Sequence, residues 1–326
     1  MQAGVGGLGG LMTELFAAGT AWTEFWQYLL IGLVAGSLYA LIALGYTMVY
    51  GIIELINFAH GDLFMLGAFL ALQVAVWVGV TTAASENVSI AGTVLLMLAV
   101  TPLACAALNV TVDRLVYRPL RTAPKLAPLV SAIGVSFVFM NLGLFWRGAT
   151  DVKFPDLISD TNLADGTGLR LTWKDLMVVG LTVPTMIALT LFVRFTSLGK
   201  AMRATAQNPT AAQLMGIDVD RVIAVTFGIG GALAGIAAVV YGLYIKAVGY
   251  QMGFQNGLYA FTAAVLGGIG NIPGAVLGGL VIGVVGELGK AYVGAKWSEA
   301  LIFAILIVIL LFRPNGLLGA RTREKV

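Results

Sequence analysis

AVGYQMGFQNGLYAFTAAVLGGIGNIPGAVLGGLVIGVVG, residues 247–286, is a run of 40 residues without Asp, Glu, Lys, Arg or His. Because a helix needs about 20 apolar residues to cross the hydrocarbon core of a bilayer, this run is too long for one crossing. The segment GGIGNIPG at 267–274 interrupts it, since four glycines and a proline do not continue a helix. The run therefore predicts two membrane segments separated by non-helical backbone.

Long uncharged runs also fill the rest of the chain. Hydrophobic residues make up 59% of the 326 residues and charged residues only 11%, against roughly 25% charged in an ordinary soluble domain. We predict an all-α integral membrane protein, a polytopic helical bundle of about eight transmembrane segments, two of them interrupted. Residues 25–326 should form a single transmembrane domain, preceded by a flexible, Gly-rich N-terminal segment at 1–24. The other uncharged runs are Phe25–Ile53, Leu63–Ser85, Val88–Val112, Leu126–Trp146, Leu176–Val193, Val222–Ile245 and Ala300–Phe312.

The basic residues predict the orientation in the membrane. Twelve of the 19 fall in segments 113–128, 194–221 and 313–326, which the positive-inside rule places in the cytoplasm. In the loop 147–174 basic and acidic residues balance, so we expect it outside. The N-terminus is then periplasmic and the C-terminus cytoplasmic. The basic segments also suit anionic lipid head groups, and for 313–326 we favour that simpler interpretation.

Two interrupted segments mark a candidate transport path. The break at 267–274 has a counterpart at 51–62, and paired interruptions in two halves of a transporter point to a path at the repeat interface. The halves resemble each other only weakly, so an internal pseudo-repeat and two unrelated breaks both stay open. The candidate path residues are Asn57, His60, Asp62, Gly267, Gly268 and Asn271.

The polar residues near the first break have two interpretations. Glu54, Asn57, His60 and Asp62 lie within nine residues, and ionisable groups inside a membrane are functional candidates. They could instead lie in a connection at the cytoplasmic interface and cap the helix that follows, and this interpretation is slightly favoured.

A short helix is predicted in the loop 194–221. Asn208 is a good N-cap, Pro209 is favoured at the first helical position, and Gly216 is favoured just past the end. About two turns of helix are not stable alone, so we expect a separate motor subunit to pack on them. The residues expected to couple to that subunit are Asn208, Pro209, Ala211, Ala212, Leu214, Met215 and Gly216.

Catalytic and metal-binding patterns are missing from the sequence. His60 is the only histidine and Cys105 the only cysteine, and no phosphate-loop motif occurs, so we predict no catalytic residue, no metal site and no cofactor bound by this chain. Any ATP would be used by partner subunits. A secondary transporter or channel with Glu54 and Asp62 as ion sites stays open as a rival, whereas an intramembrane enzyme lacks a nucleophile–base pair.

Four ordered motifs carry a family resemblance. NFAHGDLFMLGAF (57–69), GKAMRATAQNPTAAQLMGI (199–217), GGIGNIPGA (267–275) and FRPNGLLG (312–319) resemble the permeases of bacterial ABC importers of the branched-chain amino acid (LivH) type. The likeness runs from about residue 25 to the end. It implies a heterodimer with a second, related permease, two cytoplasmic ATPases and a periplasmic binding protein, in the bacterial inner membrane and without nucleic acid.

The resemblance also identifies 204–217 with the loop that carries the coupling helix. The acidic residue that leads this loop in the broader permease pattern is absent, because the sequence here is Arg203-Ala-Thr-Ala. Importers of urea and short amides share the same four motifs, so the substrate class stays open between them and branched-chain amino acids.

Overall fold

The computed structural model describes residues 5–53, 57–80, 89–124 and 126–319. The prediction of an all-α protein is confirmed, because the only strands among these residues are two residues long each. In chain order the elements are α1 (Val5–Ile53), α2 (Ala59–Trp77), α3 (Ile90–Val112), a π-helical turn η1 (Asp113–Tyr117), a 3-10 turn η2 (Arg118–Leu120), α4 (Leu126–Arg147), β1 (Val152–Lys153), α5 (Trp173–Phe195), α6 (Ser197–Gln207), α7 (Pro209–Leu214), α8 (Val219–Ile245), β2 (Ala247–Val248), α9 (Met252–Gly267), α10 (Ile272–Tyr292) and α11 (Ala295–Phe312).

Eight of the described helices are long and apolar enough to cross a membrane, as predicted: α1 from Trp22, α2, α3, α4, α5, α8, α10 and α11. Besides these eight helices, the bundle contains α9, which has 16 residues. At 1.5 Å per residue this is about 24 Å, slightly short of a hydrocarbon core of about 30 Å. It connects the end of α8 to the start of α10.

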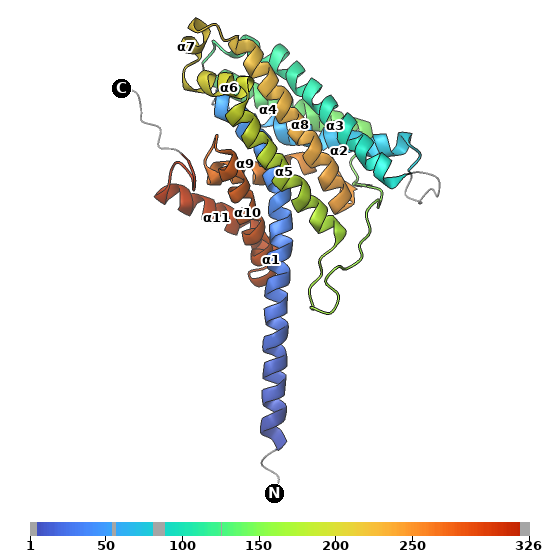
Figure 1. The fold of residues 1–326 in the computed structure, drawn as a ribbon. Coiled ribbons are helices and arrows are strands. Elements are labelled where there is room, and N and C mark those ends of the chain that lie inside the picture. Colours follow the sequence, from blue (N-terminus) through green and yellow to red (C-terminus); the bar gives the residue numbers. More distant parts are fainter. Residues whose placement is uncertain (1–4, 54–56, 81–88, 125, 320–326) are drawn as a thin grey trace.

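The connections fall at two ends of the bundle. We call the end that carries α6 and α7 the α7 end (Figure 1). The opposite end, where β1 pairs with β2, we call the strand end. Gln27 in α1 exchanges two hydrogen bonds with the backbone of Arg170 at the strand end. The earlier part of α1 therefore extends beyond the bundle, as Figure 1 shows. Residues 5–24 thus belong to α1, and the domain boundary at residue 25 stays a prediction.

The closest helix pair is α1 and α10, which run antiparallel. Glycines spaced four apart on each helix, Gly32 and Gly36 against Gly279 and Gly283, let the backbones approach. A Cβ on Gly36 would lie 2.7 Å from Leu280 Cα, and one on Gly279 would lie 2.7 Å from the Ala40 nitrogen. Small residues at this spacing are the usual means of packing helices in lipid, where burial of apolar surface drives association weakly.

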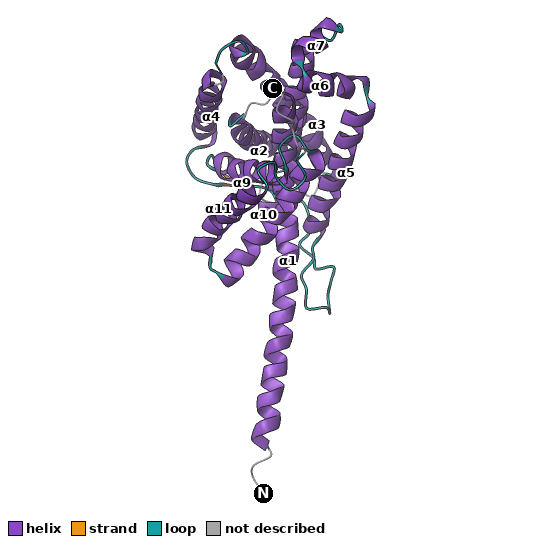
Figure 2. Cartoon of the chain, turned by 90° about the vertical axis from the view of Figure 1, so that its left-hand side faces the viewer, coloured by secondary structure: helices purple, strands orange, loops and turns teal. Residues whose placement is uncertain are grey.

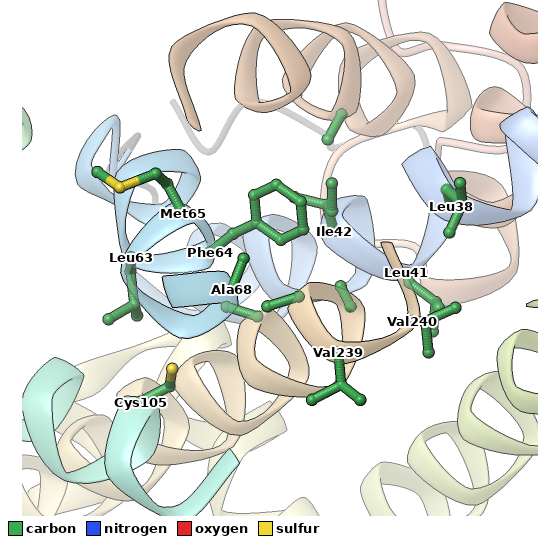
Figure 3. Close-up of a cluster of buried hydrophobic side chains, with 14 of the residues drawn as sticks. Leu38, Leu41, Ile42, Leu63, Phe64, Met65, Ala68, Cys105, Val239 and Val240 are labelled. Atoms are coloured by element: carbon green, nitrogen blue, oxygen red, sulfur yellow. The ribbon is translucent and has the colours of Figure 1, made fainter. Parts of the chain in front are cut away.

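The core lies between α1, α2, α3 and α8. Ile42, Phe64, Cys105 and Val239, one from each helix, are buried in the same cluster (Figure 3). The helices α4 and α5 lie on opposite sides of the bundle (Figure 2), and both keep most of their apolar residues exposed in the single chain. Since apolar surface of this extent is stable only against lipid or another protein, the described fold is that of a multi-pass membrane protein.

Candidate functional site

The predicted short helix is present as α7, Pro209–Leu214. The Asn208 side chain accepts a hydrogen bond of 3.0 Å from the Ala211 backbone N–H, and Pro209 occupies the first turn. Gly216 has φ +84°, a conformation that favours glycine, and the Ile217 N–H donates to the Ala212 carbonyl at 3.0 Å to close the helix. Both ends of α7 are thus fixed by the residues that predicted it.

The exposed surface of α7 differs from expectation at one residue. Leu214 and Met215 are 84% and 82% exposed, as a docking surface requires. Ala212, expected on that surface, is only 4% exposed because it faces the bundle and packs in the main core cluster. The outward surface of α7 is therefore made by Leu214 and Met215, with Ala211 beside them.

Near the middle of the bundle, the start of α2 brings polar side chains together. His60 is completely buried, with its ring centroid 4.6 Å from that of Tyr46 and its imidazole beside Gly45 of α1. Asp62 Oδ2 accepts a hydrogen bond from the Ser136 hydroxyl, halfway along α4. Asn57 Oδ1 accepts hydrogen bonds from the Ala59 N–H at 3.1 Å and from the Tyr117 hydroxyl at 2.8 Å.

These contacts decide between the two interpretations of the cluster. The Asn57 side chain accepts a hydrogen bond from the first N–H of α2, whose N-cap is Phe58, but His60 and Asp62 lie at the depth of mid-helix residues and not at an end of the bundle. Glu54 lies outside the described residues. Ser136 and Tyr117, which complete the polar contacts, come from distant parts of the chain, and no local pattern in the sequence pointed to them.

The second break is shorter than predicted and lies within the predicted segment 267–274. Only Gly268–Asn271 are non-helical, and Asn271 caps α10 by accepting a hydrogen bond of 3.0 Å from Gly274 N–H. The C-terminal segment closes the break, since the backbone N–H groups of Leu317 and Leu318 donate to the carbonyls of Leu266 and Gly267 at 2.8 and 3.0 Å.

The structure therefore separates the candidate path residues into two groups. Asn57, His60 and Asp62 lie together at the start of α2. Gly267, Gly268 and Asn271 contact the C-terminal segment at the α7 end, where Asn271 also donates to the Leu318 carbonyl at 2.7 Å. The internal pseudo-repeat stays a prediction.

Ion pairs connect the loops at the α7 end. Arg121 pairs with Asp113 at 2.7 Å and also with Asp220 at the start of α8, and Arg118 pairs with Asp220 at 2.7 Å. The Tyr117 ring, within the same turn, packs 5.3 Å from that of Phe227. The network therefore connects Asp220, which follows the α7 loop, to the turn that contains Tyr117. Tyr117 in turn donates its hydrogen bond to Asn57 at the start of α2.

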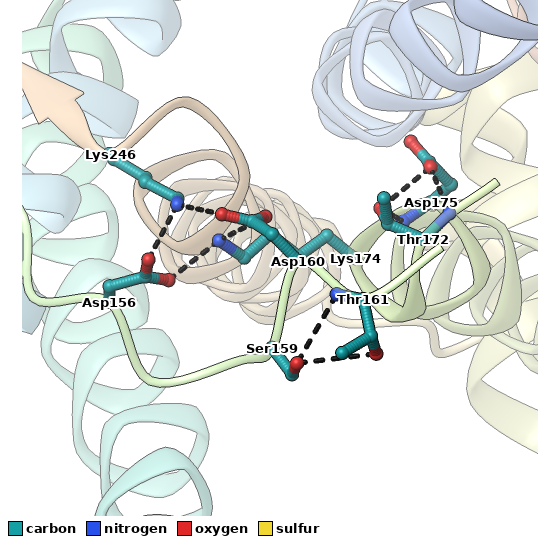
Figure 4. A network of polar contacts seen from close by, with 8 residues as sticks. All are labelled: Asp156, Ser159, Asp160, Thr161, Thr172, Lys174, Asp175 and Lys246. Carbon is teal, nitrogen blue, oxygen red and sulfur yellow. Dashed lines mark hydrogen bonds and ion pairs between the residues drawn. The ribbon is translucent and has the colours of Figure 1, made fainter. Parts of the chain in front are cut away.

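A second network occupies the strand end (Figure 4). Lys174 pairs with Asp156 at 2.6 Å and with Asp160 at 2.8 Å, and Lys246 pairs with the same two aspartates. Hydrogen bonds from the two lysines lower the pKa of Asp160 to about 2. Partial burial raises the pKa of Asp156, but the same lysines outweigh it and leave that pKa below its usual value. The aspartates raise the pKa of Lys246.

Comparison with known proteins assigns the chain to a family. The family model of the branched-chain amino acid transport system permease component matches residues 28–310. The chain belongs to this family. It is 39% identical over 308 residues to the high-affinity branched-chain amino acid transport system permease protein LivH of Salmonella typhimurium, covering 93% of this chain and 98% of that protein.

Two further relatives in this permease family are similarly close. The LivH permease of Escherichia coli strain K12 is 38% identical over 309 residues, and the BraD permease of Pseudomonas aeruginosa is 40% identical over 308, each with 93% of this chain and 98% of the relative covered. No solved structure matches the chain significantly. These relatives are transport permease proteins and not enzymes, and the match spans every helix of the bundle from α1 to α11.

Proposed function

We propose that this chain is the membrane permease subunit of an ATP-binding-cassette importer that takes up branched-chain amino acids. The proposal rests on the family match over the whole bundle. The short helix α7 supports it, because Leu214 and Met215 are apolar and exposed there, as a surface that docks another subunit requires. A carrier that works alone does not require such a helix. Separate ATPase subunits bind and hydrolyse the ATP, and this chain binds no cofactor.

The proposed assembly contains four kinds of partner contact. A second, related permease forms a heterodimer with this chain, two ATPases bind at the α7 end, a periplasmic binding protein delivers the substrate at the strand end, and lipid surrounds the bundle. The α7 end carries most of the exposed arginines and is the cytoplasmic end by the positive-inside rule. The protein then lies in the bacterial inner membrane with a periplasmic N-terminus and a cytoplasmic C-terminus.

The proposed path for the substrate passes the start of α2. Asn57, His60 and Asp62 supply polar groups near the middle of the bundle, where such groups are costly unless they serve a substrate or a neighbouring helix. The break at Gly267, Gly268 and Asn271 lies at the cytoplasmic end of the proposed path, covered by the C-terminal segment.

Uptake by a reconstituted complex tests the function. The chain is co-expressed with the permease and ATPase genes of its operon, purified as a complex and placed in liposomes with ATP inside and the binding protein outside. Radiolabelled leucine, isoleucine and valine should accumulate only with ATP, and this chain alone should accumulate none. Uptake of urea or acetamide in place of the amino acids would reject the proposed substrate class, and gradient-driven uptake by the lone chain would reject the importer.

Labelling from the two sides of the membrane tests the orientation. Thr122 and Thr161 are exposed at opposite ends of the bundle. In a Cys105→Ala background, Thr122→Cys should react with an impermeant thiol reagent only from the cytoplasmic side, and Thr161→Cys only from the periplasmic side. Reaction of both from one side would contradict the proposed topology.

A further inference from the structure

A cavity of about 280 Å³ lies between α4 and α9, close to the start of α2. Its walls are aromatic and aliphatic side chains, among them Ile133, Phe137, Phe254 and Phe261. Ser136 contributes a hydroxyl, and Gly253 and Gly257 of α9 contribute bare backbone. Small-molecule sites commonly combine such an apolar wall with a few polar groups that fix the orientation of the ligand.

The polar group behind this cavity is the carboxyl of Asp62. Its Oδ2 accepts the hydrogen bond from Ser136, whereas its Oδ1 is buried without a hydrogen-bond partner among the described residues. Asp62 is only 2% exposed, and none of the ion pairs in the described part of the chain includes it. A carboxylate buried with one hydrogen bond and no cation is unfavourable, so its free oxygen is a place for a donor or a cation.

Asp62 does not itself line the cavity, but two residues that do line it, Ser136 and Gly253, lie directly beside its carboxyl. A Cβ on Gly253 would lie 2.7 Å from Asp62 Oδ1, so the oxygen is directly beside a residue that lines the cavity. A Cβ on Gly257 would lie 3.1 Å from the Tyr46 hydroxyl. Because neither glycine has a side chain, only backbone lies between a ligand in the cavity and the carboxylate.

We infer that this cavity binds the substrate on its way through the permease, with the substrate ammonium at Asp62 and Ser136 and the branched hydrocarbon side chain against the aromatic wall. This inference rests on the proposed function and specifies which side chains the substrate contacts on its way through the membrane. The lining residues include no cation, so the geometry assigns a place to the ammonium and the hydrocarbon side chain of the substrate and not to its carboxylate.

Protection of a cysteine in the cavity tests the site directly. Ile133 lines the cavity on α4, and Phe145, on the same helix, is 93% exposed and outside it. Ile133→Cys and Phe145→Cys are made separately with Cys105→Ala, and the purified complex is treated with a methanethiosulfonate reagent. Isopentylamine and isovalerate serve as probes, since they share a carbon skeleton and carry opposite charges.

Isopentylamine should slow the modification of Ile133→Cys, whereas isovalerate should not, and neither should protect Phe145→Cys. Adding Asp62→Asn should raise the concentration of amine needed for protection at least about tenfold, because a hydrogen bond to a charged group is lost. If Asp62→Asn fails to assemble, the contrast between the two probes in Ile133→Cys still decides the question.

Equal protection by both probes, or unchanged protection in Asp62→Asn, would contradict the proposed binding site. So would the absence of any reaction at Ile133→Cys, because the cavity would then be closed to water. None of them depends on the uptake assay. Uptake of leucine without selective amine protection would reject this site and leave the proposed function intact. Amine protection without leucine uptake would reject the proposed substrate.

Discussion

The two ends of the bundle each carry a network of ion pairs, and they differ in which charge is buried. At the α7 end, Arg121 and Asp113 form a pair that is 18% and 1% exposed in its side chains, while Leu214 and Met215 stand almost fully in solvent. At the strand end, Asp156 and Asp160 are about half exposed, and the buried partner is Lys174, whose side chain is 3% exposed. The exposed apolar side chains of Leu214 and Met215 indicate that another protein covers the α7 loop.

The largest expected effect is the loss of docking at α7. Leu214→Arg should lower both uptake and the amount of co-purified ATPase more than about tenfold, because burying a guanidinium without a partner against an apolar surface costs several kcal/mol. Leu214→Met keeps the bulk and the apolar character and should behave like the wild type. Wild-type uptake and ATPase binding in Leu214→Arg would show that α7 is not the contact and would remove this difference between the two ends.

Two glycines with nearly the same φ allow the packing at the two ends to be compared. Gly268 at the α7 end and Gly294 at the strand end have φ +106° and +108°. A Cβ on Gly268 would lie 2.7 Å from Gly319 Cα, whereas a Cβ on Gly294 would meet nothing within 4 Å. Both alanine variants bear the strain of a positive φ, of about 1–2 kcal/mol, and Gly268→Ala adds overpacking of about 1–3 kcal/mol.

Gly268→Ala should therefore lower the midpoint of thermal unfolding in detergent clearly more than Gly294→Ala. Equal midpoints would mean that the C-terminal segment is not packed on the break in the way that the structure shows. Gly268→Leu extends the test to transport, since the larger side chain should displace residues 315–319 and abolish uptake.

The ion pairs themselves should differ in strength. Arg121→Gln leaves the buried carboxyl of Asp113 without its cation, which should cost about 2–3 kcal/mol. Lys246→Gln leaves both aspartates with Lys174, and an exposed pair contributes less than about 1 kcal/mol. The unfolding midpoints of the two variants, measured side by side, check this order. A reversed order would contradict the inference that burial decides the difference.

The sequence predicted the short helix α7 and the membrane helices well, and the contacts between distant helices poorly. The bounds of α7 follow from Asn208, Pro209 and Gly216, because capping and turn preferences act within a few residues. The membrane helices likewise follow from charge-free length. The direction that Ala212 faces, and the contacts of Asp62 with Ser136 and of Asn57 with Tyr117, depend on helix packing between distant segments, which no local pattern records.

The break near 267–274 illustrates the same limit. Its glycines and proline predicted non-helical backbone, and the prediction was right for residues 268–271. The closing segment, 315–319, is about 50 residues further on, and the sequence contains no signal for that contact beyond its own glycines.

The smallest expected effect is the acid response of the strand end. A carboxyl whose pKa is lower in the folded than in the unfolded chain stabilises the fold above the unfolded value, about 3.9 for Asp. That contribution is lost as the pH falls through the folded value, which is about 2 for Asp160. The pKa of Lys246 is raised in the folded chain, so its ion pairs stabilise the fold at neutral and acid pH. This stabilisation is lost only at alkaline pH, as the pH rises through the folded pKa of the lysine.

The difference in unfolding midpoint between the wild type and Asp160→Asn should therefore stay constant from about pH 8 to pH 5 and shrink only below about pH 4. Asp165→Asn, in the same loop and outside the four-residue network, is the matched control and should show no such trend. A difference that already disappears between pH 7 and pH 5 would mean that the lysines do not hold Asp160. The ion-pair network of the strand end would then not depend on Asp160.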